Sequence, residues 1–205
     1  MKLAASVITM AAVVLCSGLV LAREPVIGGP CEGCENVFAE MPAQVVSAAR
    51  IAPPDEPGVP MMITGTVRAK DGTPAAGIIV YAYHTDAAGV YPAALTRHGR
   101  LRGWARTDQH GEYRFSTTRP GAYPEGGVPE HVHMHVIEPG RATYYIDDLV
   151  FGDDPLLTAR HRQVMRGRGG DGLSDPRRDD NGVWQVRRDI VLGLNIPGYE
   201  SSERR

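Results

Sequence analysis

The sequence lacks a charge excess, an internal repeat and any low-complexity tract, and it contains only three cysteines. Its 22 lysine and arginine residues face 24 acidic residues, which leaves a formal net charge of −2. Proteins that bind nucleic acids usually carry a basic excess on at least one face. The charge balance gives no sign of a polyanionic partner, so we expect no nucleic acid among the partners.

Length and composition favour one all-β domain. A chain of 205 residues is long enough for a sizeable core, but it is too short for two ordinary domains once an N-terminal leader is subtracted. The 24 glycines and 16 prolines lie between short runs of β-branched and aromatic residues, which indicates many turns. We therefore expect a β-sandwich.

The N-terminal segment 1–22 has the pattern of a secretory signal peptide. Lys2 precedes an unbroken run of apolar and small residues that ends in Val20-Leu21-Ala22, a small-residue cleavage pattern. An uncleaved anchor helix is the alternative, because the run approaches the ~20 residues that span a bilayer. A lipoprotein site at Cys16 is disfavoured by the large residues before it. We expect an exported protein, periplasmic or secreted, with no membrane segment in its mature form.

Cleavage of this leader would leave Cys31 and Cys34 as the only cysteines. In an exported protein, a Cys-x-x-Cys pair of this kind favours a short-loop disulfide. A redox or metal role is the alternative. A redox pair is expected to open a helix in a βαβ setting, and two thiolates alone make an incomplete zinc site.

The rest of the chain divides into an N-terminal arm, 23–60, and a β core, 61–200. The arm holds the two cysteines and a helix-compatible stretch at 44–50. A segment at 160–180, rich in Gly, Arg and Asp, is typical of a long loop that covers a site. Alternating patterns and turn residues predict strands at 63–67, 78–84, 104–107, 112–116, 131–137, 144–151 and 184–192.

One of these strands carries three histidines at alternate positions, His131, His133 and His135, with apolar residues between them. On a strand, all three imidazoles leave one face while the apolar residues enter the core. Histidines two apart have Cα atoms ~6.5–7 Å apart, a span that two imidazoles can bridge to one ion. A row of exposed or hydrogen-bonded histidines is the simpler alternative. Imidazole alone does not select among zinc, copper, iron and nickel.

Two tyrosines favour ferric iron among these metals. Tyr91 and Tyr123 each lie in a loop just after a predicted strand, rather than at a core position. A phenol with a pKa near 10 ionises at neutral pH only with strong help, which a trivalent hard cation supplies. Taken singly, each tyrosine also fits the simpler role of packing a turn.

The order of these motifs resembles that of the intradiol ring-cleavage dioxygenases, the family that cleaves protocatechuate and catechol. The resemblance runs from about Gly65 to Pro155. It is carried by Gly89-Val-Tyr91, Arg102-Gly103, the Thr-Asp-x-x-Gly-x-Tyr-x-Phe pattern at 107–115, Thr-x-x-Pro-x-x-Tyr-Pro at 117–124, Pro-x-His-x-His at 129–133 and Phe-x-x-Asp-Pro at 151–155.

The resemblance implies an Fe(III) site with Tyr91, Tyr123, His131 and His133 as the metal ligands. It also implies a reaction in which a catechol and O2 give a cis,cis-muconate. In that reaction Tyr123 is the displaceable ligand and internal base. The iron would act as a Lewis acid and a template for the substrate.

Two positions depart from the family pattern. Val128 stands where an arginine usually precedes the first ligand histidine by three residues, and Asp148 stands where a glutamine is expected. We expect Arg102 or Arg106, close in sequence to the site strands, to supply the missing charge. The chain also lacks the helical dimerisation region of the catechol enzymes, so assembly into a homo-oligomer stays open.

Two other functions stay open at this stage. A non-catalytic β-sandwich module that holds metal or a catecholic ligand is favoured by Val128. A zinc or copper site formed by His131, His133 and His135 is the other alternative, and Tyr91 and Tyr123 argue against it because neither metal requires them.

Overall fold

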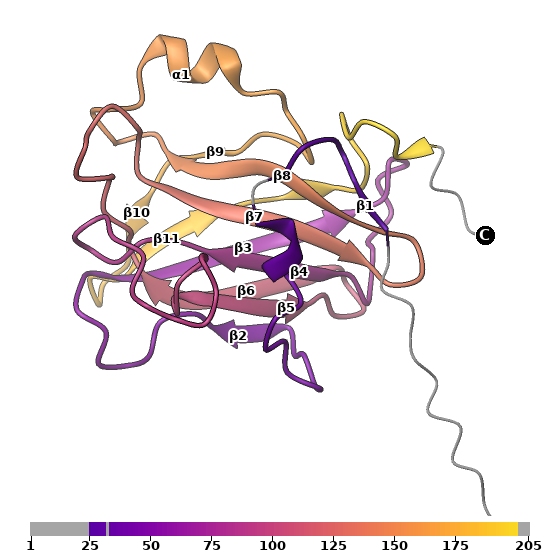
Figure 1. The fold of residues 1–205 in the computed structure, drawn as a ribbon, viewed down its shortest axis with the longest axis horizontal. Helices are drawn as coiled ribbons and strands as arrows, with labels where there is room; N and C mark the ends of the chain where they lie inside the picture. Colours follow the sequence, from indigo (N-terminus) through magenta and orange to yellow (C-terminus); the bar gives the residue numbers. More distant parts are fainter. Residues whose placement is uncertain (1–24, 32, 201–205) are drawn as a thin grey trace, which may run out of the picture.

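The computed structural model describes residues 25–31 and 33–200, and these residues form two β-sheets that face each other (Figure 1). The first sheet has the strand order β1-β8-β7-β4-β5, and β9 pairs with β8. The second has the order β10-β11-β3-β6-β2, and β12 pairs with β3. The predicted all-β sandwich is confirmed. The predicted leader, 1–22, lies outside the described residues.

The strands of the first sheet bring distant parts of the chain together. They are β1 (Val26–Ile27), β4 (Ile79–Tyr83), β5 (Arg102–Arg106), β7 (His131–Glu138), β8 (Ala142–Phe151) and β9 (Leu173–Ser174). The second sheet contains β2 (Ala48–Arg50), β3 (Pro60–Arg68), β6 (Glu112–Thr118), β10 (Arg177–Arg178), β11 (Trp184–Arg187) and β12 (Ile190–Val191). Two short helices complete the description, the 3-10 helix η1 (Cys34–Asn36) and α1 (Ala159–Val164).

The core between the sheets follows from the alternation along each strand. On β7, Val132, Met134 and Val136 are fully buried in the main apolar cluster, where they meet residues of β3 and β6 such as Ile63 and Phe115. Because successive side chains of a strand point to opposite faces, the three histidines of β7 leave the other face. The alternation of apolar residues with histidines along β7 thus determines which face of the sheet carries the imidazoles.

The N-terminal arm differs from the sequence prediction. The stretch 44–50 forms no helix, and its end instead forms β2, which pairs in parallel with β6. Before β2, the carbonyl oxygens of Val46 and Ser47 accept hydrogen bonds from the amides of Arg106 and Arg114. The open edges of β5 and β6 offer backbone partners that a short isolated helix would not have.

The C-terminal part also differs in detail from the prediction. The expected loop at 160–180 includes α1, β9 and β10. The expected strand at 184–192 divides into β11 and β12, which pair with β3 in the same parallel register on either side of an interruption at Arg188 and Asp189.

The Arg188 guanidinium is fully buried and ties this region together. It donates hydrogen bonds to the carbonyl oxygens of Asp147 at 3.2 Å, Arg168 at 3.1 Å, Gly169 at 3.3 Å and Asp189 at 2.7 Å. Burial lowers the pKa of Arg188. The segment before β9 is thereby fastened to β8, whose outer face borders the histidines of β7.

Within the described residues, no helix is long and apolar enough to cross a lipid bilayer.

A matched pair of leucines tests where the stability of the sandwich resides. Leu149 on β8 is fully buried, whereas Leu95 in the β4–β5 loop is 87% exposed. We expect Leu149→Ala to lower the free energy of unfolding by about 2–5 kcal/mol, because it leaves a cavity. Leu95→Ala should change it by no more than about 0.5 kcal/mol. Urea denaturation followed by circular dichroism measures both, and equal effects would contradict this description of the core.

Candidate metal centre

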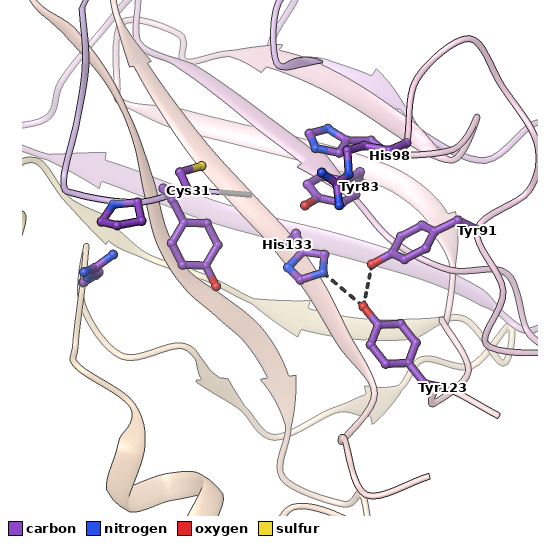
Figure 2. A pocket seen from close by; sticks show the side chains of 10 residues that line it. Cys31, Tyr83, Tyr91, His98, Tyr123 and His133 are labelled. Carbon is purple, nitrogen blue, oxygen red and sulfur yellow. Dashed lines mark hydrogen bonds between the residues drawn. The ribbon is translucent and has the colours of Figure 1, made fainter. Parts of the chain in front are cut away.

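His133, Tyr91 and Tyr123 converge at one end of the first sheet (Figure 2), and His131 lies beside them, within 3.2 Å of both Tyr123 and His133. His131 and His133 come from the start of β7, where a register irregularity between Val132 and Met134 falls at His133. Tyr91 comes from the loop after β4, and Tyr123 comes from the loop after β6. The structure therefore brings together the four residues that the family resemblance pointed to.

The polar atoms of these four side chains lie within hydrogen-bonding range of one another. The Tyr123 hydroxyl lies 3.2 Å from Nε2 of His131 and 3.4 Å from Nε2 of His133. The two Nε2 atoms are 3.2 Å apart. The Tyr91 and Tyr123 hydroxyls are 2.8 Å apart. Two nitrogen and two oxygen donors thus share one small space.

The other ring nitrogen of each histidine determines its tautomer. Nδ1 of His131 lies 2.7 Å from the carbonyl oxygen of Pro129, and Nδ1 of His133 lies 2.8 Å from Oδ1 of Asp148. Both acceptors require a proton on Nδ1, so in the neutral rings both Nε2 atoms present lone pairs. Two lone pairs that face each other at 3.2 Å repel unless a cation or a proton lies between them. This arrangement is typical of metal-ligating histidines.

Burial keeps the Tyr91 hydroxyl protonated when no cation is bound. Burial, and next the hydrogen bond between Tyr91 and Tyr123, raise the pKa of Tyr91 far above its ordinary value. Burial, and next the charge of His133, lower the pKa of His131. The site therefore favours neutral groups by itself, and ionisation of a phenol here requires a strongly charged cation.

The loops that carry the two tyrosines are held against each other by backbone contacts. The amide of Gly121 donates to the carbonyl oxygen of Asp86 at 2.8 Å. Gly89 has φ 79°, and a Cβ at this position would lie 1.8 Å from the carbonyl oxygen of Ala122. A side chain at position 89 would therefore push the loops apart, and glycine is required for this close approach.

The donor set fits a hard trivalent cation such as Fe(III). Two imidazole nitrogens with two phenolic oxygens suit iron better than zinc or copper, which have no need of tyrosinate. The carboxylate of Asp148 also lies near His131 and His133, yet it binds Nδ1 of His133, on the ring edge away from the shared space. Asp148 therefore orients the His133 ring from outside the shared space. Burial opposes ionisation of Asp148, but the charge of His133 and its hydrogen bond lower the pKa of Asp148 overall.

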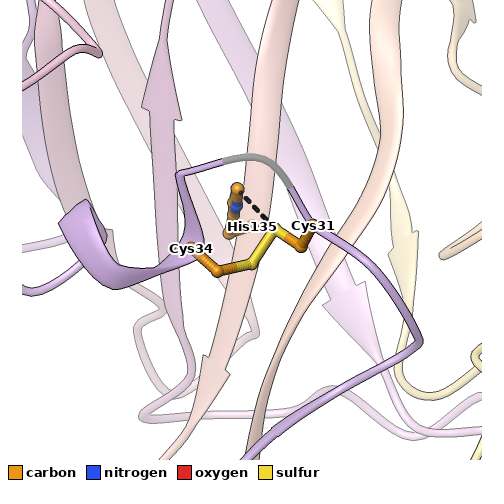
Figure 3. A group of neighbouring side chains, drawn as sticks. All are labelled: Cys31, Cys34 and His135. Atoms are coloured by element: carbon orange, nitrogen blue, oxygen red, sulfur yellow. Dashed lines mark hydrogen bonds between the residues drawn. A yellow bond between two sulfur atoms is a disulfide. The ribbon is translucent and has the colours of Figure 1, made fainter.

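The third histidine of β7 does not join this group. His135 lies beside the disulfide that links Cys31 and Cys34 (Figure 3). Among the described residues, potential ligand atoms form two separate groups, one with His131 and His133 and the other with His135. This separation argues against a site made of all three histidines.

The arginines near the site are not the two that were expected. Arg102 donates to the Ala39 carbonyl oxygen at 3.1 Å and pairs with the Glu40 carboxylate, and Arg106 is exposed on β5. Neither lines the pocket of about 500 Å³ that contains Tyr91, Tyr123 and His133. Arg97 and Arg168 line it instead. Sequence patterns could not identify them, because each lies in an irregular loop that only the tertiary fold brings to the site.

Comparison with known proteins agrees with this geometry. The Dioxygenase_C family model, described as "Dioxygenase", matches residues 37–168. Chlorocatechol 1,2-dioxygenase of Pseudomonas sp. (strain P51) is 30% identical over 167 residues, which cover 76% of this chain and 61% of the relative. Catechol 1,2-dioxygenase 1 of Acinetobacter lwoffii is 34% identical over 103 residues, covering 40% of this chain and 33% of the relative. The chain thus spans only part of the length of the curated relatives it matches.

Solved structures show the same fold. Catechol 1,2-dioxygenase of Acinetobacter radioresistens superimposes with a TM-score of 0.61 at 23% identity, covering 88% of this chain and 66% of the other. The dioxygenase domain of a carbohydrate-binding fusion protein from Streptomyces sp. SirexAA-E gives a TM-score of 0.57 at 23% identity, covering 74% of this chain and 91% of the domain. The fold and site define a β-sandwich with a histidine and tyrosine centre. The chain belongs to the intradiol ring-cleavage dioxygenase family.

Substitution of Asp148 tests its role in orienting His133. We expect Asp148→Ala to weaken iron binding by about 10–100-fold, because groups that hold the second nitrogen of a metal-binding histidine have effects of this size. Asp148→Asn, which keeps an acceptor oxygen but loses the charge, should have a smaller effect. Iron content after dialysis against graded chelator measures both variants. The exposed Asp180 provides the control, and an Asp148→Ala protein that retains iron as well as Asp180→Ala would contradict this role.

Proposed function

We propose that this chain is a non-haem Fe(III) intradiol dioxygenase that acts outside the cytoplasm. In the proposed reaction, O2 and a catechol-type aromatic give a cis,cis-muconate-type product by cleavage between the two hydroxylated carbons. The observation that carries the proposal is the convergence of two imidazole Nε2 atoms and two tyrosine hydroxyls within hydrogen-bonding range. Bound Fe(III) would act as a Lewis acid and orient the substrate oxygens.

Tyr123 is well placed to handle the proton of an incoming catechol. Its hydroxyl is the central atom of the group, because it contacts Tyr91 at 2.8 Å, His131 at 3.2 Å and His133 at 3.4 Å. Its side chain comes from a loop rather than from a strand, so it can move with less disturbance to the core than the histidines can. We assign Tyr123 as the displaceable ligand and internal base.

The walls of the pocket suit a planar ring. Tyr83 lies against His133 with ring centroids 4.6 Å apart, and its centroid lies 6.0 Å from that of Tyr91. Tyr145 lines the same pocket. Aromatic walls of this kind bury the faces of a flat substrate and exclude water from it.

The charge of the pocket favours an anionic substituent on that ring. Arg97 and Arg168 both line the pocket, and no carboxylate does so among the described residues. A guanidinium binds a carboxylate with charge-assisted hydrogen bonds. We therefore propose a carboxylated catechol, such as 3,4-dihydroxybenzoate, as a better substrate than catechol itself.

Location outside the cytoplasm rests on the signal-peptide pattern at 1–22. A disulfide between Cys31 and Cys34 is consistent with an oxidising compartment. A location of this kind suits a substrate that reaches the cell from its surroundings.

A non-catalytic binding module is the second candidate function. Position 128 favours it, because Val128 is 40% exposed beside the site and carries no charge that could act on a bound ring. Consumption of O2 separates the two functions.

The colour of the purified protein tests the metal assignment. Tyrosinate bound to Fe(III) should make the protein visibly red, and anaerobic addition of catechol should shift the absorption band. Tyr123→Phe should weaken or shift this band, because one tyrosinate is lost. Tyr113→Phe should retain it, since the Tyr113 hydroxyl donates to the carbonyl oxygen of Arg188 and Tyr113 does not line the pocket.

Colourless protein with bound zinc would contradict the dioxygenase proposal. Red protein that consumes no O2 with any of a panel of catechols would favour the binding module. An unchanged spectrum and iron content in Tyr123→Phe would show that the ligand assignment is wrong.

The substrate class can be tested separately with Arg168→Gln. We expect kcat/KM for 3,4-dihydroxybenzoate to fall by about 10–100-fold, because a charge-assisted hydrogen bond contributes ~1.5–3 kcal/mol. The value for catechol should change by less than about threefold. Oxygen-electrode kinetics measure both, with Arg160→Gln on the exposed face of α1 as the control. Equal losses for the two substrates would contradict the proposed carboxylate contact.

A further inference from the structure

A second group of potential metal ligands lies at the wall of the pocket, where the N-terminal arm crosses the first sheet (Figure 3). Cys31 and Cys34 are joined by a disulfide, with Cα atoms 5.6 Å apart. Nε2 of His135 lies 3.9 Å from Sγ of Cys31. Ligand atoms of these three residues all lie within 4.8 Å of one another.

His135 has no strong hydrogen-bond partner although it is almost fully buried. Its side chain is 1% exposed, and Nδ1 is without a partner among the described residues. Its Nε2 faces only a disulfide sulfur, which is a weak acceptor. Buried polar groups normally find partners, so the imidazole of His135 is a candidate ligand for a cation bound beside the cysteines.

A second buried imidazole faces the same Cys-x-x-Cys turn. Nδ1 of His98 lies 2.8 Å from the Tyr81 hydroxyl, whereas Nε2 of His98 is buried and unpartnered within the described part of the chain. The turn residue Gly33 has φ 79°, and a Cβ there would lie 2.3 Å from this Nε2. Glycine at position 33 thus lets the His98 ring approach the backbone between the two cysteines.

We propose that reduction of the disulfide converts this cluster into a second metal site, for Zn²⁺ or a similar borderline cation. Cys31, Cys34 and His135 would be three ligands, and the His98 ring, whose centroid lies 6.2 Å from that of His135, would move toward them to become the fourth. Two thiolates with two imidazoles form a donor set typical of zinc. Its sulfur donors distinguish it from the nitrogen and oxygen donors of the candidate iron centre.

An external dithiol is the reductant in this conversion. The dithiol transfers two electrons and two protons to the Cys31–Cys34 bond, and it becomes a disulfide itself. The two thiols then lose their protons to solvent as the divalent cation binds both sulfurs. The neutral imidazoles of His98 and His135 contribute lone pairs and release no proton.

The arm has contacts that would hold it in place after reduction. Val37, just after η1, is fully buried, and its carbonyl oxygen accepts a hydrogen bond from Nε1 of Trp104 at 2.8 Å. The amide of Val37 also donates to the carbonyl oxygen of Cys34. The end of the Cys-x-x-Cys turn is therefore fixed by packing that does not depend on the disulfide.

The second site would be a near neighbour of the candidate iron centre. The Tyr83 ring lies between them, with its centroid 3.8 Å from that of His98 and 4.6 Å from that of His133. Cys31 and His98 also line the pocket. The proposal does not rest on the dioxygenase function, because its ligands are a different set.

Titration with cobalt(II) tests the proposal, since thiolate-bound tetrahedral cobalt has characteristic charge-transfer and visible bands. We expect the wild-type protein, reduced with a dithiol under anaerobic conditions, to bind one Co²⁺ with these bands. The oxidised protein and the reduced Cys31→Ser/Cys34→Ser protein should show none of them. Zn²⁺ should then displace the cobalt and remove the bands.

Histidine variants identify the remaining ligands. His135→Gln and His98→Gln should each weaken Co²⁺ binding by at least about 100-fold. Loss of a residue that merely supports a ligand already costs 10–100-fold, and these variants would lose a ligand itself. His110→Gln, at an exposed histidine, is the matched control and should bind as wild type does.

Absence of thiolate bands in the reduced wild-type protein would overturn the proposal without the need for any variant. Unchanged Co²⁺ affinity in both histidine variants would also overturn it, because the cysteines would then bind without the imidazoles. Neither result bears on the red colour or O2 consumption that test the dioxygenase function.

Discussion

The candidate iron centre depends on two hydrogen bonds that lie outside it. The carbonyl oxygen of Pro129 and the carboxylate of Asp148 hold Nδ1 of His131 and His133, and they thereby turn both Nε2 lone pairs into one space. Without these partners the two rings could rotate apart to relieve their repulsion. The sandwich supplies the constraint, because β7 and β8 pair directly and bring Asp148 behind its histidine. The chemistry of the pocket follows from this forced approach.

The features that could be predicted from the sequence are those set by local patterns, such as the alternation of side chains along a strand. Alternation along 131–137 placed the histidines on one face, and the order of motifs pointed to Tyr91 and Tyr123. Pairings between distant segments could not be predicted in this way. The stretch 44–50 had a helical pattern, yet its last three residues form β2, because they pair with the edge of β6. No sequence pattern showed that Asp148 would bind His133, or that His135 would face the cysteines.

The positive charge of the pocket illustrates the same limit. Sequence proximity favoured Arg102 and Arg106, which lie on β5, but the structure directs Arg102 to Glu40 and leaves Arg106 in solvent. The arginines at the pocket come from loops that meet only in three dimensions. One of them, Arg168, has its backbone held by the buried Arg188 guanidinium. A cation in the core thus helps to position a cation at the pocket.

The unbroken alternation of core and pocket side chains along β7 limits how this protein can change during evolution. A deletion or insertion of one residue in β7 would exchange the faces of the strand, so that ligands would enter the core and core residues would enter the pocket. The loops that carry Arg97 and Arg168 can gain or lose single residues without exchanging the two faces of a strand. Changes in loop length and charge can therefore alter the pocket, while the strand that carries His131 and His133 keeps its register.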